Sequence, residues 1–327
     1  MMNKDSFFMK TINGKWSLTL ITLVTILCWS LVIAFKSDDF SIQPNHSLFF
    51  GPLTKLVSPR ILLFVNYLLV LGTSFLLLWL DQVFSIIRTK TFLPFLFYTL
   101  FITTDPGSFF SLPGNLTTLI LLAVIYQLFR SYQKEKNVEE AFNIGLLISA
   151  GSLFSTRILF FIPVIWIGLS YTRAFSRKSF FASIVGLLTP YWLTFCWFLY
   201  QKDISGFIEP FYHFFQVNPS SALEYEISGW IRVCFSLLIT IFAVINFRMH
   251  SFKDKIKTRT YFYFILTLII FVAILIIFNI IPVTEYAGIY YLSVSLFAAH
   301  FFVTVNSRLS AVFFYLSLIT FIGLLFF

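Results

Sequence analysis

The sequence predicts an all-α, polytopic integral membrane protein with about 11 transmembrane helices and almost no soluble domain. Of its 327 residues, 58% are hydrophobic and 11% are charged. A soluble globular chain is about 45–50% apolar and about 25% charged. Apolar runs of spanning length also recur from one end of the chain to the other. Lipid is the solvent that this composition fits, and helices satisfy their backbone hydrogen bonds there.

The predicted helices are the apolar runs of spanning or near-spanning length. They lie at about 16–35, 61–80, 91–104, 114–129, 139–154, 157–172, 179–200, 229–247, 261–281, 287–305 and 309–327. The runs at 91–104, 139–154 and 157–172 are short or carry glycine or proline, so the first two are not certain to cross fully. A chain of such runs predicts a single membrane domain over residues 1–327.

The orientation follows from lysine and arginine, which are enriched in cytoplasmic connections. With a cytoplasmic N-terminus, 17 of the 23 bases fall in cytoplasmic segments and 6 on the opposite side. An odd number of helices then places the C-terminus on the outer side of the membrane. The formal net charge of +9 is explained by this topology, and we expect no nucleic-acid partner. The outer connections at 36–60 and 201–228 are long enough to shape a site, and 229–327 supplies the C-terminal helices.

Acidic residues of the outer connections are the candidate catalytic groups. Asp38 and Asp39 follow the first helix, where a carboxylate can act as a general base on an acceptor. The adjacent pair could also hold a divalent cation, although no motif requires one. Asp105 emerges on the same face, within an Asp-Pro-Gly sequence that is typical of a turn. Solvated loop acids and a turn-forming aspartate are the alternatives.

Candidate substrate-binding residues share that outer face. Arg157 lies against the positive-inside trend, and arginine binds phosphate in bidentate fashion. A snorkelling arginine at a helix end explains it equally well. Glu209 and His213 occupy the 201–228 connection among aromatic residues, and His46 lies in the first outer connection. An aromatic belt at the membrane surface is the alternative there.

Ionisable groups within the helices are rare. His300 lies in an apolar run, where such a group is functional or hydrogen-bonds a neighbouring helix. We find no nucleotide-binding or zinc-protease motif and no metal-ligand spacing, so no metal ligands are predicted.

Two features together resemble GT-C glycosyltransferases, which use polyprenyl-phosphate-sugar donors. One is residues 37–39 directly after the first helix, followed by a segment with His46. The other is the stretch from Gly145 to Arg157, followed by a basic connection and a helix with Pro190. The resemblance covers about the first 200 residues and is one of layout. It implies Asp38 or Asp39 as the catalytic acid, Asp105 as a second acidic site and Arg157 as a contact to the lipid phosphate.

Residues 138–195 also resemble an uncharacterised family of multi-pass inner-membrane proteins of Bacteroidota. The resemblance rests on 141–145, 152–154 and 186–191. It implies a Gram-negative inner membrane and no particular activity.

The leading hypothesis is therefore a glycosyltransferase that moves a sugar from a polyprenyl phosphate to a periplasmic acceptor. Its expected partners are membrane lipids and a polyprenyl-phosphate-linked sugar. The alternatives are a transporter or flippase of a lipid-linked or small substrate, and a non-enzymatic subunit of an envelope complex.

Overall fold

The computed structural model describes residues 58–134, 137–212, 227–278, 283–305 and 308–324. Of the N-terminal segment it describes residues 19, 22, 26, 29 and 30, all of which are helical. All regular elements of these residues are helices, with no strand among them, which confirms the predicted all-α class.

The helices of the described segments follow the apolar runs closely. They are α4 (Pro59–Phe84), α5 (Leu93–Thr103), α6 (Pro106–Phe109), α7 (Leu112–Arg130), α8 (Val138–Ser152), η2 (Thr156–Phe161), α9 (Ile162–Tyr171), α10 (Arg177–Tyr200), α11 (Ile204–Tyr212), α12 (Ile227–His250), η4 (Ser251–Lys253), α13 (Ile256–Ile277), α14 (Val283–Thr304) and α15 (Arg308–Gly323).

Six helices of this set are long and apolar enough to cross a membrane. They correspond to α4, α7, α10, α12, α13 and α14. Shorter apolar helices occur at Leu93–Thr103, Thr156–Tyr171 and Ser310–Gly323. Several helices of this length and composition in one chain are typical of a polytopic membrane protein.

Proline marks many of the helix starts. Pro59, Pro94, Pro106, Pro113 and Pro163 each occupy the first or second helical position of their helix. Proline has no N–H to leave unsatisfied there, and its fixed φ suits the first turn. The same residues therefore separate apolar segments that would otherwise read as longer runs.

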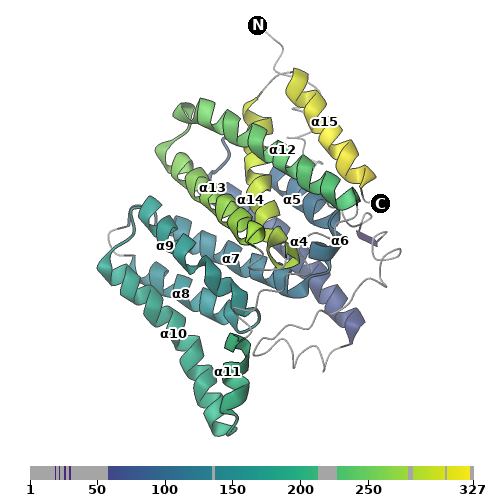
Figure 1. Cartoon of the computed structure of the whole chain (residues 1–327). Coiled ribbons are helices and arrows are strands. Elements are labelled where there is room, and N and C mark those ends of the chain that lie inside the picture. The colour runs from purple at the N-terminus through teal and green to yellow at the C-terminus, as the bar shows by residue number, and fades with distance from the viewer. Residues whose placement is uncertain are drawn as a thin grey trace.

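Helix α14 lies at the centre of the fold, surrounded by α5, α7, α12 and α13 (Figure 1). In an apolar 18-residue stretch within Thr284–Thr304, 78% of the residues are buried, against 17% in the corresponding stretch of Arg177–Tyr200 in α10. A polar side chain on α14 therefore contacts neighbouring helices and needs a hydrogen-bond or charged partner on one of them.

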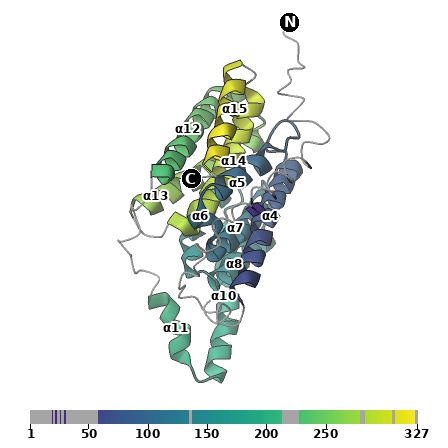
Figure 2. The same ribbon diagram turned by 90° about the vertical axis from the view of Figure 1, so that its right-hand side faces the viewer.

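Helices α10 and α11 form an arm at one end of the molecule (Figures 1 and 2). The arm is held chiefly by packing of α10 against α8. The backbones approach closely because Gly145 faces the carbonyl oxygen of Ser183, and Gly186 faces that of Phe142. Small residues permit such contacts between membrane helices.

Candidate functional site

Charged side chains from three other parts of the chain meet the N-terminal half of α14. Asp105 precedes α6, Arg157 belongs to η2 and Arg232 belongs to α12, while Glu285 and Tyr291 lie on α14 itself. We call these five residues the Asp105 cluster. Their side chains are largely buried, so each charge depends on a protein partner rather than on water.

One carboxylate oxygen of Asp105 accepts hydrogen bonds from two hydroxyl groups. The hydroxyl of Ser108 donates to its Oδ2 at 2.6 Å, and that of Tyr291 donates to the same atom at 3.0 Å. Its Oδ1 lies 3.9 Å from Nη1 of Arg232, which also donates to the carbonyl oxygen of Thr104. Among the described residues, Oδ1 accepts no hydrogen bond, so this oxygen has capacity for a further donor.

Two buried asparagines fix the backbone that presents Asp105. Asn66 of α4 donates to the carbonyl oxygen of Phe109 at 2.6 Å, and Asn115 of α7 donates to the same oxygen at 3.0 Å. Asn115 also donates to Oδ1 of Asn66 at 2.8 Å. Because α6 has only four residues, its own backbone hydrogen bonds are too few to stabilise this turn, and the asparagine side chains supply the additional bonds. Gly107 adds a close approach to α14, since a Cβ there would lie 3.0 Å from Cγ2 of Thr284.

Arg157 forms the second ion pair of the cluster. Its Nη1 donates to Oε1 of Glu285 at 2.8 Å, with side-chain exposures of 20% and 11%. Ser155 is extended just before η2, and this break between α8 and α9 turns the arginine toward α14. In this structure the anion that Arg157 meets is the Glu285 carboxylate, and its predicted contact with a lipid phosphate stays a prediction.

The cluster balances two carboxylates against two guanidinium groups. Buried charges are retained only when paired, because an uncompensated one costs several kcal/mol. A carboxylate with one free acceptor oxygen can orient a substrate hydroxyl, and an arginine can exchange its carboxylate for a phosphate. Within the described segments, no group of three or more histidine, cysteine, aspartate or glutamate side chains is arranged to hold a metal ion.

The other predicted site residues do not join the cluster. Asp38, Asp39, His46 and His213 lie outside the described residues. Glu209 is exposed on α11, and no described hydrogen bond or ion pair connects it to Asp105 or Arg157.

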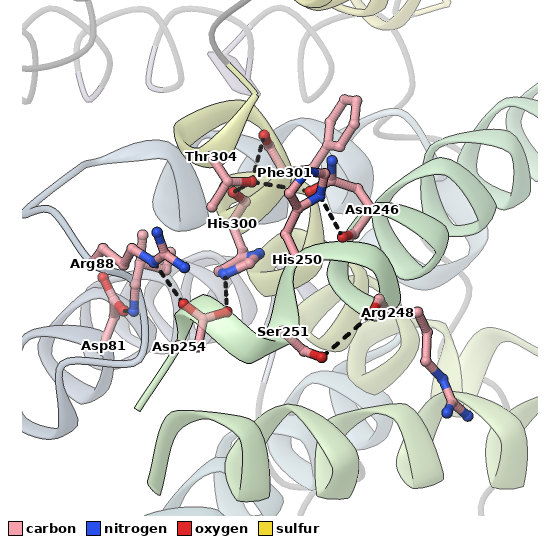
Figure 3. A network of polar contacts seen from close by, with 11 residues as sticks. Asp81, Arg88, Asn246, Arg248, His250, Ser251, Asp254, His300, Phe301 and Thr304 are labelled. Carbon is pink, nitrogen blue, oxygen red and sulfur yellow. Dashed lines mark hydrogen bonds and ion pairs between the residues drawn. The ribbon is translucent and has the colours of Figure 1, made fainter. Parts of the chain in front are cut away.

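A second polar group lies at the C-terminal end of α14. Asp254, between η4 and α13, accepts from Nε of Arg88 at 2.6 Å, and its Oδ2 lies 3.3 Å from Nε2 of His300 (Figure 3). We call these three residues the Asp254 network. Asp254 and His300 are buried, whereas the Arg88 side chain is partly exposed.

The surroundings of the Asp254 network explain its ionisation. Burial raises the pKa of the Asp254 carboxyl, but the close approach of His300 and the hydrogen-bonded Arg88 outweigh burial and leave the pKa below its ordinary value. The His300 ring packs against the rings of Phe262 and Phe247, with centroid distances of 4.6 and 5.8 Å. Its Nδ1 has no hydrogen-bond partner among the described residues.

Sequence reasoning missed most partners in both groups. Arg232 and Glu285 carried a signal, since one is a base against the positive-inside trend and the other an acid at a helix start. Asp254 lies in a basic connection and looked like an ordinary surface acid. Its contact with His300 depends on which faces of α12, α13 and α14 pack together. The hydrophobic periodicity of the sequence does not predict that packing.

Comparison with protein-family models, with curated proteins and with solved structures found no match to this chain.

Proposed function

We propose that this polytopic membrane protein is a GT-C-like glycosyltransferase. It would transfer a sugar from a polyprenyl-phosphate donor to an acceptor at the periplasmic face. The observation that supports the proposal is that Asp105 and Arg157 each contact the N-terminal half of α14, Asp105 through Tyr291 and Arg157 through Glu285. These two residues come from separate segments of the chain, and each was selected from sequence for a role in that reaction.

The contacts of Asp105 favour a positioning role. Two hydroxyls and the nearby Arg232 already fix the orientation of its carboxylate. Its Oδ1 is suited to orienting an acceptor or a sugar hydroxyl. Removal of the acceptor proton would then fall to Asp38 or Asp39, which follow the first predicted helix.

The contacts of Arg157 favour donor binding. Its ion pair with Glu285 uses Nη1 and leaves the Arg157 side chain 20% exposed, and a guanidinium group can donate to a phosphate as it does to a carboxylate. The donor phosphate would take one guanidinium edge while Glu285 keeps Arg157 oriented.

The membrane topology belongs to the same proposal. With 11 spans in an inner membrane, a cytoplasmic N-terminus and a periplasmic C-terminus, the Asp105 cluster faces the periplasm and the Asp254 network faces the cytoplasm. A lipid-linked donor could then reach the cluster from the outer leaflet.

Transfer by the purified protein is the direct test. The protein in lipid would be incubated with a radiolabelled polyprenyl-phosphate sugar, and donor turnover would be followed with and without a membrane extract as acceptor. We expect Arg157→Gln to raise the donor KM about tenfold, as loss of one charge-assisted contact predicts. We expect Asp105→Asn to lower kcat by about a hundredfold through loss of acceptor orientation.

The matched control is Asp203→Asn, which removes an exposed carboxylate near α11 on the same proposed face. Its kinetics should equal those of the parent. Donor turnover that is undetectable in the parent, or unchanged in Asp105→Asn and Asp38→Ala/Asp39→Ala, would contradict the glycosyltransferase proposal.

A transporter or flippase is the second candidate, and one observation favours it. Helix α14, the most buried of the candidate spans, carries ionisable groups near both ends, with Glu285 at one and His300 at the other. Such groups mark substrate or proton paths in membrane proteins. Movement of a fluorescent polyprenyl-phosphate lipid between leaflets of proteoliposomes, without any sugar transfer, would favour this candidate over the first.

A further inference from the structure

The connection between α12 and α13 exposes large apolar side chains. Met249, Phe252 and Ile256 are 65%, 69% and 66% exposed, at an end of the molecule where two candidate membrane spans terminate. Three exposed apolar residues within eight positions are unusual for a water-facing turn. They are typical of a segment that enters the membrane interface.

The same connection is strongly basic. Residues 248–259 contain Arg248, Lys253, Lys255, Lys257 and Arg259 and a single acid. That acid is Asp254, which is buried and paired with Arg88. The exposed surface is therefore basic without a compensating carboxylate in this stretch.

The connection is held in place from inside. Arg88 and His300 both approach Asp254, and His250 Nδ1 lies 3.1 Å from the carbonyl oxygen of Asn246 (Figure 3). The ammonium of Lys257 lies 5.6 to 5.8 Å from the centroids of three aromatic rings, those of Phe84, Tyr132 and Tyr261. The backbone that presents the bases is thus anchored to α4, to the turn that follows α7 and to α14 before any ligand arrives.

We propose that the α12–α13 connection is a binding site for anionic lipid headgroups. Lys253 and Lys255 would contact the phosphate of the headgroup, while Phe252 and Ile256 would insert among the acyl chains next to it. Charge complementarity selects the occupant, since a basic surface tipped with apolar residues at the end of two membrane spans fits an anionic lipid. A zwitterionic lipid would satisfy only the apolar part.

Lipid titration followed by native mass spectrometry of the full-length protein in detergent tests this site. The probes are phosphatidylglycerol and phosphatidylcholine of identical acyl chains. We expect tighter binding of phosphatidylglycerol, and a loss of about 25-fold in its affinity for Lys253→Gln/Lys255→Gln, since each base near an anionic surface contributes about fivefold. Lys253→Arg/Lys255→Arg keeps the charges and should bind like the parent.

The matched control is Arg177→Gln/Lys178→Gln, which removes two exposed bases from the start of α10 and changes the net charge equally. It should retain phosphatidylglycerol affinity. Equal binding of the two lipids by the parent, or equal losses in the two glutamine variants, would overturn the proposal. A monodisperse elution profile and an unchanged circular dichroism spectrum separate lost affinity from lost folding.

Discussion

Asp105, Arg157 and Asp254 each have a charged or hydroxyl partner among the described residues, and several of these partners lie far away in the sequence. Asp105 and Arg157 could be selected from sequence because an outer turn and an unexpected base single them out. Their partners Tyr291 and Glu285 are separated from them by 186 and 128 residues. Hydropathy places a residue in a helix, but it does not say which helix faces which, so these pairings required the structure.

The Arg157–Glu285 pair should contribute measurably to stability. Glu285→Gln leaves a guanidinium without its counter-charge, which we expect to destabilise the protein by about 2 kcal/mol. This is below the ~3–5 kcal/mol of a fully buried pair because Arg157 is partly solvated. Thermal unfolding in one detergent measures the effect. The double variant Arg157→Gln/Glu285→Gln should lose less than the sum of the two single variants, and strict additivity would contradict a direct interaction.

Acid stability should depend on Asp254. Its pKa is lower in the folded protein than the ordinary value of about 3.9, so ionised Asp254 stabilises the fold above that pH. The contribution disappears as the pH falls through the lowered pKa of the folded state. We expect Asp254→Asn to flatten the fall in Tm below about pH 4, compared with the parent. Glu139→Gln, which alters an exposed acid, should retain the parent's profile.

At the scale of the helices, the sequence predicted position well and packing poorly. The runs at 61–80, 114–129 and 179–200 correspond to α4, α7 and α10, because apolar length alone defines such a segment. The run at 157–172 is instead η2 followed by α9, since Pro163 begins a new helix there. Glycine positions were visible in the sequence, but the face that each one presents to a neighbouring helix was not.

The seam between α8 and α10 should be sensitive to a single methyl group. A Cβ at Gly145 would overlap the Ser183 carbonyl oxygen and contact the Leu187 nitrogen at 2.9 Å, so Gly145→Ala must separate the two backbones. We expect a loss of about 2 kcal/mol, seen as a lower Tm. Gly72→Ala is the control, because a Cβ there meets nothing within 4 Å. It should be neutral or stabilising by up to about 1 kcal/mol. Equal Tm values for the two variants would contradict the close packing.

At the scale of the whole molecule, the charges of the connections predict which ends share a side of the membrane. Asp203 follows α10 and Lys255 precedes α13, and the proposed topology places them on opposite sides. The arrangement of the helices fits either orientation of the protein in the membrane, so labelling has to decide which side faces the cytoplasm.

Single cysteines can decide it. In a variant with Cys28, Cys196 and Cys234 replaced by serine, we expect Asp203→Cys to react with an impermeant maleimide in intact spheroplasts. Lys255→Cys should react only after the membrane is opened, because that side faces the cytoplasm. A permeant maleimide should label both variants. The reverse pattern would invert the proposed topology and remove the Asp105 cluster from the periplasmic face.

The sparse burial of α10 has a consequence for handling the protein. Much of its apolar surface, including Leu188, Trp192 and Leu193, faces away from the protein, and its main internal attachment is the glycine seam with α8. Contact with acyl chains therefore contributes much of the stability of the arm formed by α10 and α11. The rate of backbone amide hydrogen exchange in α10 should depend on the choice of detergent far more strongly than the rate in α14, which is surrounded by other helices.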